Sequence, residues 1–273
     1  MQPVILATGL QSSGSTLLSW CFLQRPDMDG TLDGDCDLIP LPPEGVVTPY
    51  LWYKTTISSF DLEEQIRLLE DEGRQVRPLL VTRDVRAVWI SLMQKPYGRN
   101  GCTAEDPPLR QRFRRFLRSW EHARDAGIPL FRYEDLATDL AAPLKRLCDS
   151  LDLPWDPSMV EWPEPDPRIA DPRHGNVRFS AGGGGLASNF DPGLALRVAG
   201  TIHEEDLAWL EHHFDEFNRA MGYPRHRDGL ELLPGRHLPT WESCRRFKWR
   251  LQQKPWRHLA VKLGLSGYRP PPH

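Results

Sequence analysis

The sequence predicts an α/β fold: a three-layer sandwich with a central parallel sheet, a phosphate-binding loop and a C-terminal helical tail. The first observation is that short apolar runs alternate with helical patterns through about the first 150 residues, as they do in βαβ units. The second is a glycine turn at residues 9–14 that joins the first apolar run directly to a helical pattern. Strand, tight turn and helix in immediate succession are typical of a loop that binds phosphate groups.

Four apolar runs are expected to form the strands of the sheet, and helices are expected between them. The expected strands are residues 4–8, 50–55, 77–83 and 128–133. The expected helices run from Leu17 to Leu23, from an acidic cap at Asp61 to Gly73, from Arg86 to Met93, from Pro108 to Ala126, and after the fourth strand through Leu151. The apolar positions of these helices recur at helical spacing, which gives each one a face for packing on the sheet.

The rest of the chain is less regular. Residues 29–49 are rich in Asp, Gly and Pro and are expected to form a long loop, and the proline-rich residues 154–173 an extended segment. Helical patterning returns from Pro192 to Met221. We place a domain boundary after residue 224, which predicts a phosphate-binding domain at 1–224 and a basic extension at 225–273.

Composition and charge narrow the class of protein. The chain has 40% hydrophobic and 26% charged residues, as soluble globular proteins do, and no apolar run reaches the length of a membrane span. The first apolar run leads into the glycine loop, so we interpret it as a core strand and not a signal peptide. Five scattered cysteines without C-x-x-C spacing favour reduced thiols, no metal site and a cytoplasmic location.

Net charge is unevenly distributed. Residues 225–273 hold eleven Lys or Arg and three Asp or Glu, a balance of +8, which leaves −11 for residues 1–224 of a chain with net charge −3. The basic extension is expected to pack on the domain as a final helix; contact with an anionic membrane surface or an acidic partner are the alternatives. Nucleic-acid binding would need more than this patch.

The glycine loop has an unusual composition. Its spacing is that of G-x-x-x-x-G-K-[ST], but Ser15 stands where the lysine is expected. Backbone N–H groups and the positive end of a helix dipole still favour an anion at this turn. The missing lysine, which normally reaches the β- and γ-phosphates of a nucleoside triphosphate, makes a triphosphate an unfavourable ligand.

Two further motifs follow at strand ends. Arg83 closes the third strand and Ser91 comes eight residues later, so that both can reach one phosphate. Tyr133-Glu134-Asp135-Leu136 closes the fourth strand, at the carboxyl edge where open α/β sheets bind ligands.

These motifs, in this order over residues 4–150, resemble those of the sulfotransferases that use 3′-phosphoadenosine 5′-phosphosulfate (PAPS). The resemblance implies that the loop binds the 5′-phosphosulfate, that Arg83 and Ser91 bind the 3′-phosphate, and that Tyr133 packs near the adenine. The loop residues concerned are Ser12, Ser13, Gly14, Ser15 and Thr16. The product would be adenosine 3′,5′-bisphosphate (PAP), and no metal is required.

Catalytic residues are less well matched. In the family a lysine and a histidine occupy a K-T-H segment; here Lys54 and Thr55 fit, and Thr56 replaces the histidine. Ser12 replaces the family's Lys or Arg in the loop, so Lys54 is expected to be the main cation at the transferring sulfonate. The base must come from elsewhere, and Asp35 in the acidic 33–37 loop is the candidate, ahead of His122 and His174; a solvated acidic loop is the alternative.

Two more segments have both a functional and a structural interpretation. Arg178 and Gly182–Gly185 fall where the family places a segment over the donor. The basic run Arg110–Arg118 is expected to be a solvated helix face, with guidance of an acidic acceptor as the alternative.

The sequence therefore predicts a sulfotransferase that moves a sulfonate from PAPS to a hydroxyl, that of a carbohydrate or other natural product. A small-molecule kinase with a phosphate-binding loop and a non-catalytic nucleotide-binding scaffold are the alternatives. A kinase is disfavoured by Ser15, whereas a scaffold is suggested by Ser12, Thr56 and the basic extension.

Overall fold

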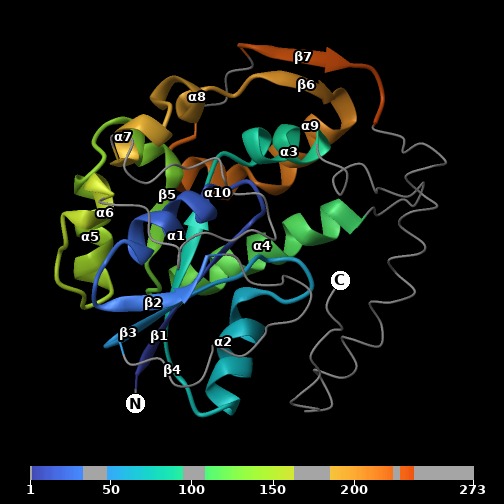
Figure 1. Cartoon of the computed structure of the whole chain (residues 1–273). Coiled ribbons are helices and arrows are strands. Elements are labelled where there is room, and N and C mark those ends of the chain that lie inside the picture. Colours follow the sequence, from blue (N-terminus) through green and yellow to red (C-terminus); the bar gives the residue numbers. More distant parts are fainter. Residues whose placement is uncertain (1, 33–47, 95–107, 163–184, 224–227, 237–273) are drawn as a thin grey trace, which may run out of the picture.

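The computed structural model describes residues 2–32, 48–94, 108–162, 185–223 and 228–236 (Figure 1). The strands are β1 (Pro3–Gly9), β2 (Met28–Thr31), β3 (Tyr50–Lys54), β4 (Gln75–Thr82), β5 (Leu130–Arg132), β6 (Gly200–His203) and β7 (Leu230–Leu233). The helices are α1 (Ser15–Leu23), α2 (Leu62–Asp71), α3 (Val85–Met93), α4 (Pro108–Asp125), the 3₁₀ turn η1 (Tyr133–Ala137), α5 (Ala142–Ser150), α6 (Ser158–Glu161), α7 (Gly185–Asn189), α8 (Pro192–Leu196), α9 (Glu204–His213) and α10 (Asp215–Ala220).

A five-stranded parallel sheet in the order β2-β3-β1-β4-β5 forms the centre of the molecule. Both faces of the central strands are covered, which is why they are apolar without strict alternation. The α/β fold with a central parallel sheet is thus confirmed. Because all five strands are parallel, the segments that follow β1, β3, β4 and β5 emerge at one edge of the sheet.

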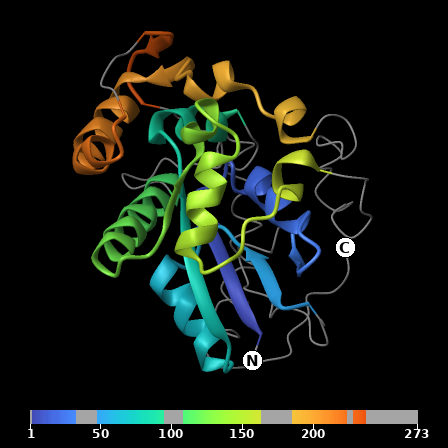
Figure 2. The ribbon, with the colours of Figure 1, turned by 90° about the vertical axis from the view of Figure 1, so that its left-hand side faces the viewer.

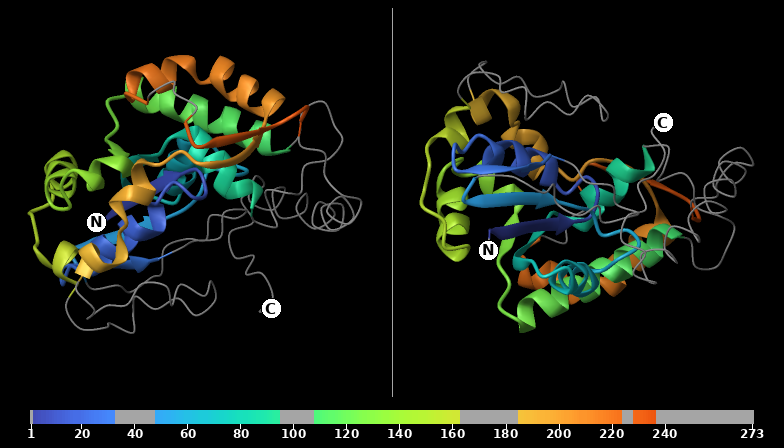
Figure 3. Two further views of the ribbon diagram at one scale, coloured as in Figure 1. Left: turned by 90° about the horizontal axis from the view of Figure 1, so that it is seen from above. Right: turned by 60° about the horizontal axis from the view of Figure 1, so that its bottom comes forward.

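Helices cover the two faces of the sheet and give two hydrophobic clusters. On one face α1 packs with α5, α6 and α7 around Ile5 and Trp52. On the other face α2, α4, α9 and α10 pack around Val4 and Tyr53. Figure 2 and the right panel of Figure 3 show α1 on one side of the strands and α2 with α4 on the other. The sheet is therefore the middle layer of three.

The structure corrects two predictions of secondary structure. Residues 28–31, at the start of the expected loop, form the edge strand β2, which pairs with β3. The expected helix from Pro192 to Met221 is divided into α8, β6, α9 and α10. Gly200, at a φ of 133°, begins β6 in a conformation that no helix continues through. The helical spacing further on holds, since Leu207, Leu210, Phe214 and Phe217 lie in the core.

Most of the predicted extension lies outside the described residues. The exception is β7, which runs parallel to β6 from Leu230 to Leu233 and forms a two-stranded sheet with it. Among the helices of the described ranges, none combines the length and apolar character needed to cross a membrane.

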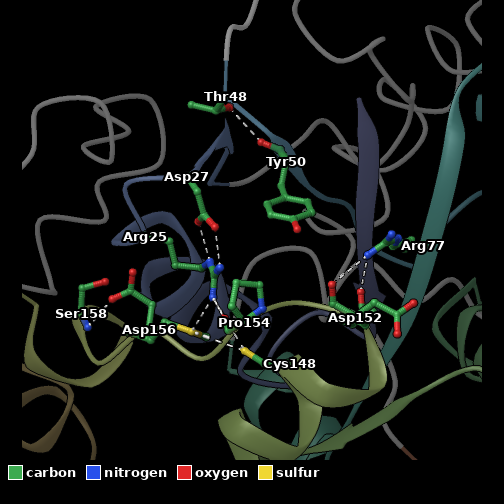
Figure 4. Close-up of polar contacts among 12 residues, drawn as sticks. Arg25, Asp27, Thr48, Tyr50, Arg77, Cys148, Asp152, Pro154, Asp156 and Ser158 are labelled. Atoms are coloured by element: carbon green, nitrogen blue, oxygen red, sulfur yellow. Dashed lines mark hydrogen bonds and ion pairs between the residues drawn. The ribbon is translucent and has the colours of Figure 1, made fainter. Parts of the chain in front are cut away.

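A buried arginine attaches the end of α1 to the segment after α5. Arg25 donates to both carboxylate oxygens of Asp27, at 2.9 and 2.7 Å, and to the carbonyl of Pro154 at 2.6 Å. Figure 4 shows its guanidinium between these partners, with the Cys148 sulfur nearby. In the same view Arg77 of β4 donates to the carbonyl of Asp152.

Replacing Asp27 by alanine is expected to lower the free energy of unfolding by about 2–3 kcal/mol, since it leaves a buried guanidinium without its counter-charge. The Arg25 side chain is 1% exposed and that of Asp27 is 27% exposed, which places the effect below that of a fully buried pair. Urea denaturation measures it. The matched control is Arg67→Ala, which breaks the exposed pair of Arg67 with Glu63 and is expected to cost about 0.5 kcal/mol; equal losses would contradict the prediction.

Candidate functional site

The loop between β1 and α1 has the backbone of an anion-binding turn. Ser12 and Gly14 have left-handed φ angles of 72° and 89°, and the N–H of Ser13 donates to the carbonyl of Leu10 at 3.2 Å. Gly14 caps α1 without a side-chain hydrogen bond, and the first turn of the helix contains no acidic residue. The first N–H groups of a helix have no acceptor within the helix, so this terminus can receive an anion.

Tyr133 covers the loop at Gly14. A Cβ atom on Gly14 would lie 2.1 Å from the ring carbon Cδ2 of Tyr133, so the ring contacts the glycine directly. Phe190 meets the same ring edge to face, with centroids 5.5 Å apart. The tyrosine of the third motif thus lies on the first motif, although Gly14 and Tyr133 are 119 positions apart in the chain.

Arg83 joins the same group from the end of β4. Its Nη1 donates to the carbonyl of Ser12 at 3.0 Å, and its guanidinium carbon lies 4.8 Å from the centroid of the Tyr133 ring. The arginine, the tyrosine and the loop therefore form one contiguous site. Ser91 is half-buried in the last turn of α3, two helical turns from the strand end that carries Arg83.

Lys54 lies at the end of β3, beside the start of α1. Trp52 faces α1, because its Nε1 donates to Ser19 Oγ at 2.9 Å, and alternation along a strand puts Lys54 on the same face. From Trp52 to Lys54 the strand advances about 6.6 Å toward the carboxyl edge. From Ser19 back to Ser15 the helix advances about 6 Å in the same direction. Lys54, which is 4% exposed, is thus level with the first turn of α1.

The other residues considered for acid–base chemistry lie in different parts of the chain, and some are outside the described residues. Thr55 Oγ1 donates to Gln65 Oε1 at 2.5 Å, and Thr56 is buried beside it. His122 is on α4, ten residues and so about 15 Å beyond Arg112, where its Nδ1 is 4.0 Å from Glu63 Oε2. It is therefore separated along α4 from the residue that contacts the glycine loop. Asp35, His174, Arg178 and Gly182–Gly184 lie outside the described residues.

A buried polar network supports the strand end that carries Arg83. Arg86 is 2% exposed and pairs with Asp84 at 2.5 and 3.0 Å. Glu134 accepts from the N–H of Asp84 at 2.8 Å and from the hydroxyl of Tyr223 at 3.1 Å. Glu134, which follows β5, thus links the ends of β4 and β5.

Glu134 is expected to make stability depend on pH. Burial raises the pKa of its carboxyl above the ordinary value of 4.5, and the bonds to Asp84 and Tyr223 oppose this only in part. A raised folded-state pKa contributes stability that is full below 4.5 and is lost as the pH rises through the folded-state value. Denaturation in urea should therefore show Glu134→Gln gaining stability relative to the unchanged protein between pH 4.5 and 7. Glu70→Gln, the same change on the exposed face of α2, is the matched control; a constant difference for Glu134→Gln would contradict the prediction.

The arginines of α4 are not the solvated face expected from the sequence. Arg110 pairs with Asp206 of α9 at 2.8 Å and lies over the ring of Trp209. Arg112 donates from Nη1 to Gln11 Oε1 in the glycine loop, and Arg115 donates from Nη1 to the carbonyl of Ser58 at 2.8 Å. The contact of Arg112 with Gln11 could not be predicted from the sequence, because the two residues are 101 positions apart.

The residues at this edge suit an anionic ligand. Ser13 Oγ and Arg83 Nε, both hydrogen-bond donors, are buried and make no hydrogen bond within the described ranges, which in a folded protein calls for a reason. The acceptor oxygens of a bound phosphate or sulfate group would give both donors a hydrogen-bond partner. Within those same ranges, no cluster of His, Cys, Asp and Glu has the composition of a metal site.

Three solved structures of sulfotransferases align with the chain. The sulfotransferase domain of the Synechococcus PCC 7002 olefin synthase aligns at a TM-score of 0.53 and 16% identity, over 82% of this chain and 96% of its own. The sulfotransferase domain of the curacin biosynthetic pathway aligns at a TM-score of 0.49 and 15% identity, over 92% of this chain and 98% of its own. Mouse sulfotransferase SULT7A1 complexed with PAP aligns at a TM-score of 0.40 and 14% identity, over 82% of this chain and 86% of its own.

The chain therefore has the sulfotransferase fold. No protein-family model matches the sequence, and no curated protein matches it significantly. The fold agrees with the resemblance found in the sequence motifs, while the residues of the site have to support any activity by their own chemistry.

Proposed function

We propose that this protein transfers a sulfonate group from PAPS to an acceptor hydroxyl. The observation that carries the proposal is the convergence of Arg83 and Tyr133 on a phosphate-binding loop that has no lysine. A loop without that lysine suits a donor that has no γ-phosphate. The acceptor would be a hydroxyl-bearing small molecule or glycan.

Each group of residues has a task in this proposal. The backbone N–H groups and hydroxyls of Ser13–Thr16 would hold the 5′-phosphosulfate, Arg83 and Ser91 the 3′-phosphate, and Tyr133 the adenine. As the bond from sulfur to the phosphate oxygen breaks and the bond to the acceptor oxygen forms, Lys54 would stabilise the negative charge on the leaving oxygen and the sulfonate. The acceptor proton passes to a base, for which Asp35 is the candidate.

Calorimetry with PAP and with Mg²⁺-ATP tests the donor site. The protein is expected to bind PAP and to prefer it over ATP. Arg83→Ala is expected to weaken PAP binding at least about tenfold, because it removes a charge-assisted contact. Arg67→Ala, on the exposed surface of α2, is the control and should change nothing.

Transfer of labelled sulfonate from PAPS to a panel of sugars and other hydroxyl compounds tests the activity itself. Preference for ATP would overturn the proposal in favour of a kinase. Tight PAP binding without transfer to any acceptor would favour the non-catalytic scaffold.

A further inference from the structure

Two arginines of α4 lie at the junction between the glycine loop and the segment that follows β3. Arg112 contacts Gln11 in the loop, and Arg115, one helical turn later, contacts Ser58. The two segments adjoin each other, because the N–H of Ile57 donates to the carbonyl of Gly9 at 2.9 Å. The guanidinium groups of Arg112 and Arg115, which we call the arginine pair, thus border both the loop and the segment that begins at Lys54.

The arginine pair approaches from the face of the sheet opposite to α1. Phe113 and Phe116 of α4 pack in the cluster that contains Tyr53, whereas Trp52 belongs to the cluster that contains α1. Figure 2 shows α4 and α1 on opposite sides of the strands. Lys54 shares the face of α1, so it and the arginine pair flank the end of the sheet from two sides. An anion at the start of α1 would be contacted from the side that carries Lys54.

Positive charge gathers at the arginine pair. Burial lowers the pKa of Arg115, and the nearby charges of Arg118 and Arg112 lower it further, while Glu64 and Asp61 act in the opposite direction. Arg118 has an ion-pair partner in Asp61 at 3.7 Å. In the described part of the chain no carboxylate comes within ion-pair distance of Arg112 or Arg115. Like charges held together without a carboxylate cost free energy, and an anionic ligand would remove that cost.

We propose that the arginine pair binds an anionic group of the acceptor, and that the acceptor is therefore an acidic hydroxyl compound. The group would be an oxyanion, such as a carboxylate, a phosphate ester or a sulfate ester, because a guanidinium donates two parallel hydrogen bonds to such groups. This inference rests on the proposed sulfonate transfer and adds the acceptor's chemistry to it. The donor's phosphosulfate is assigned to the α1 side, so the oxyanion on the α4 side belongs to the second substrate.

Inorganic sulfate is a suitable first probe, with PAP present at saturation so that the donor site is filled. Arginine side-chain Nε–H signals in ¹H–¹⁵N spectra report the titration, with each signal assigned from its loss in Arg112→Gln, Arg115→Lys or Arg118→Gln. The signals of Arg112 and Arg115 are expected to shift with sulfate, and that of Arg118 is not. Absence of any shift overturns the inference. A shift that occurs only without PAP also overturns it, since the arginines would then serve the donor.

The second set of probes distinguishes the oxyanions. Glucuronate, glucose 6-phosphate and glucose 6-sulfate are each titrated against glucose, on the same signals of the PAP-saturated protein. At least one anionic sugar is expected to bind at least tenfold more tightly than glucose, and Arg112→Gln is expected to remove the difference. Arg118→Gln, the same change two turns along the helix, should keep it. Equal binding of all four sugars, or a preference that persists in Arg112→Gln, overturns the inference. If PAP itself does not bind in calorimetry, the proposed function fails, while sulfate shifts at the arginine pair would still show its anion site.

Discussion

Replacing Lys54 by alanine is expected to reduce sulfonate transfer by about 100- to 1000-fold, the effect of removing one preorganised charge from a transition state. The residue is buried at the carboxyl end of β3 and level with the first turn of α1. In the loop itself, serines occupy positions 12 and 15, where the motif comparison leads one to expect cations. The negative charge that develops as the sulfonate leaves the phosphate oxygen would therefore depend on Lys54 on that face of the sheet.

Single-turnover transfer from labelled PAPS measures the chemical step, and calorimetry with PAP measures binding. The rate should fall much more than the affinity for PAP, because Lys54 would meet both the leaving oxygen and the sulfonate in the transition state, and PAP keeps only the oxygen. Thr56→Ala is the matched control, because Thr56 is a buried residue just after the end of β3 and its replacement removes no charge. A loss of PAP affinity equal to the loss of rate would contradict the prediction and make Lys54 a binding residue.

The parts of this site that could be predicted from the sequence are those encoded within a few residues. The strand, the turn and the helix from Val4 to Leu23 are adjacent in the chain, and so are the strand end and the arginine at Arg83. Parallel strands then bring the motifs to one edge, so that the contact of Arg83 with Ser12 needs only the correct sheet topology. The capping box at Asp61 and Glu64 is local in the same way and is present in the structure.

Contacts between distant residues could not be predicted. Arg112 and Gln11 are 101 residues apart, and a basic helix face has the same sequence pattern whether it meets solvent or a loop. The burial of Arg86 has the same origin: its partner Asp84 lies two residues away, but its burial depends on how α3 packs. Gly200 is the local indication that the expected helix after Pro192 is divided. The apolar residues around it recur at helical spacing, and this pattern favours a continuous helix more strongly than one glycine opposes it.

Replacing Gly14 by alanine is expected to lower the free energy of unfolding by about 2–4 kcal/mol, and to weaken PAP binding at least about tenfold. Two costs add at this position. A φ of 89° is unfavourable for any residue with a Cβ atom, by about 1–2 kcal/mol. The Cβ would also lie 2.1 Å from Cδ2 of Tyr133, so the ring or the loop must move, at about 1–3 kcal/mol for overpacking. Either movement shifts the first N–H groups of α1 or the ring that covers them.

The two costs can be separated within this chain. Gly73 has a φ of 73° and no heavy atom within 4 Å of an added Cβ, so Gly73→Ala carries the backbone cost alone and is expected to lose about 1 kcal/mol. Tyr133→Ala in the Gly14→Ala background removes the clash and should recover part of the stability, but not the affinity for PAP, since the ring is lost. Urea denaturation and calorimetry give both quantities for each variant. If Gly14→Ala loses no more stability than Gly73→Ala, the ring does not hold the loop; a larger loss that Tyr133→Ala relieves means that the tyrosine fixes the loop in its anion-binding form.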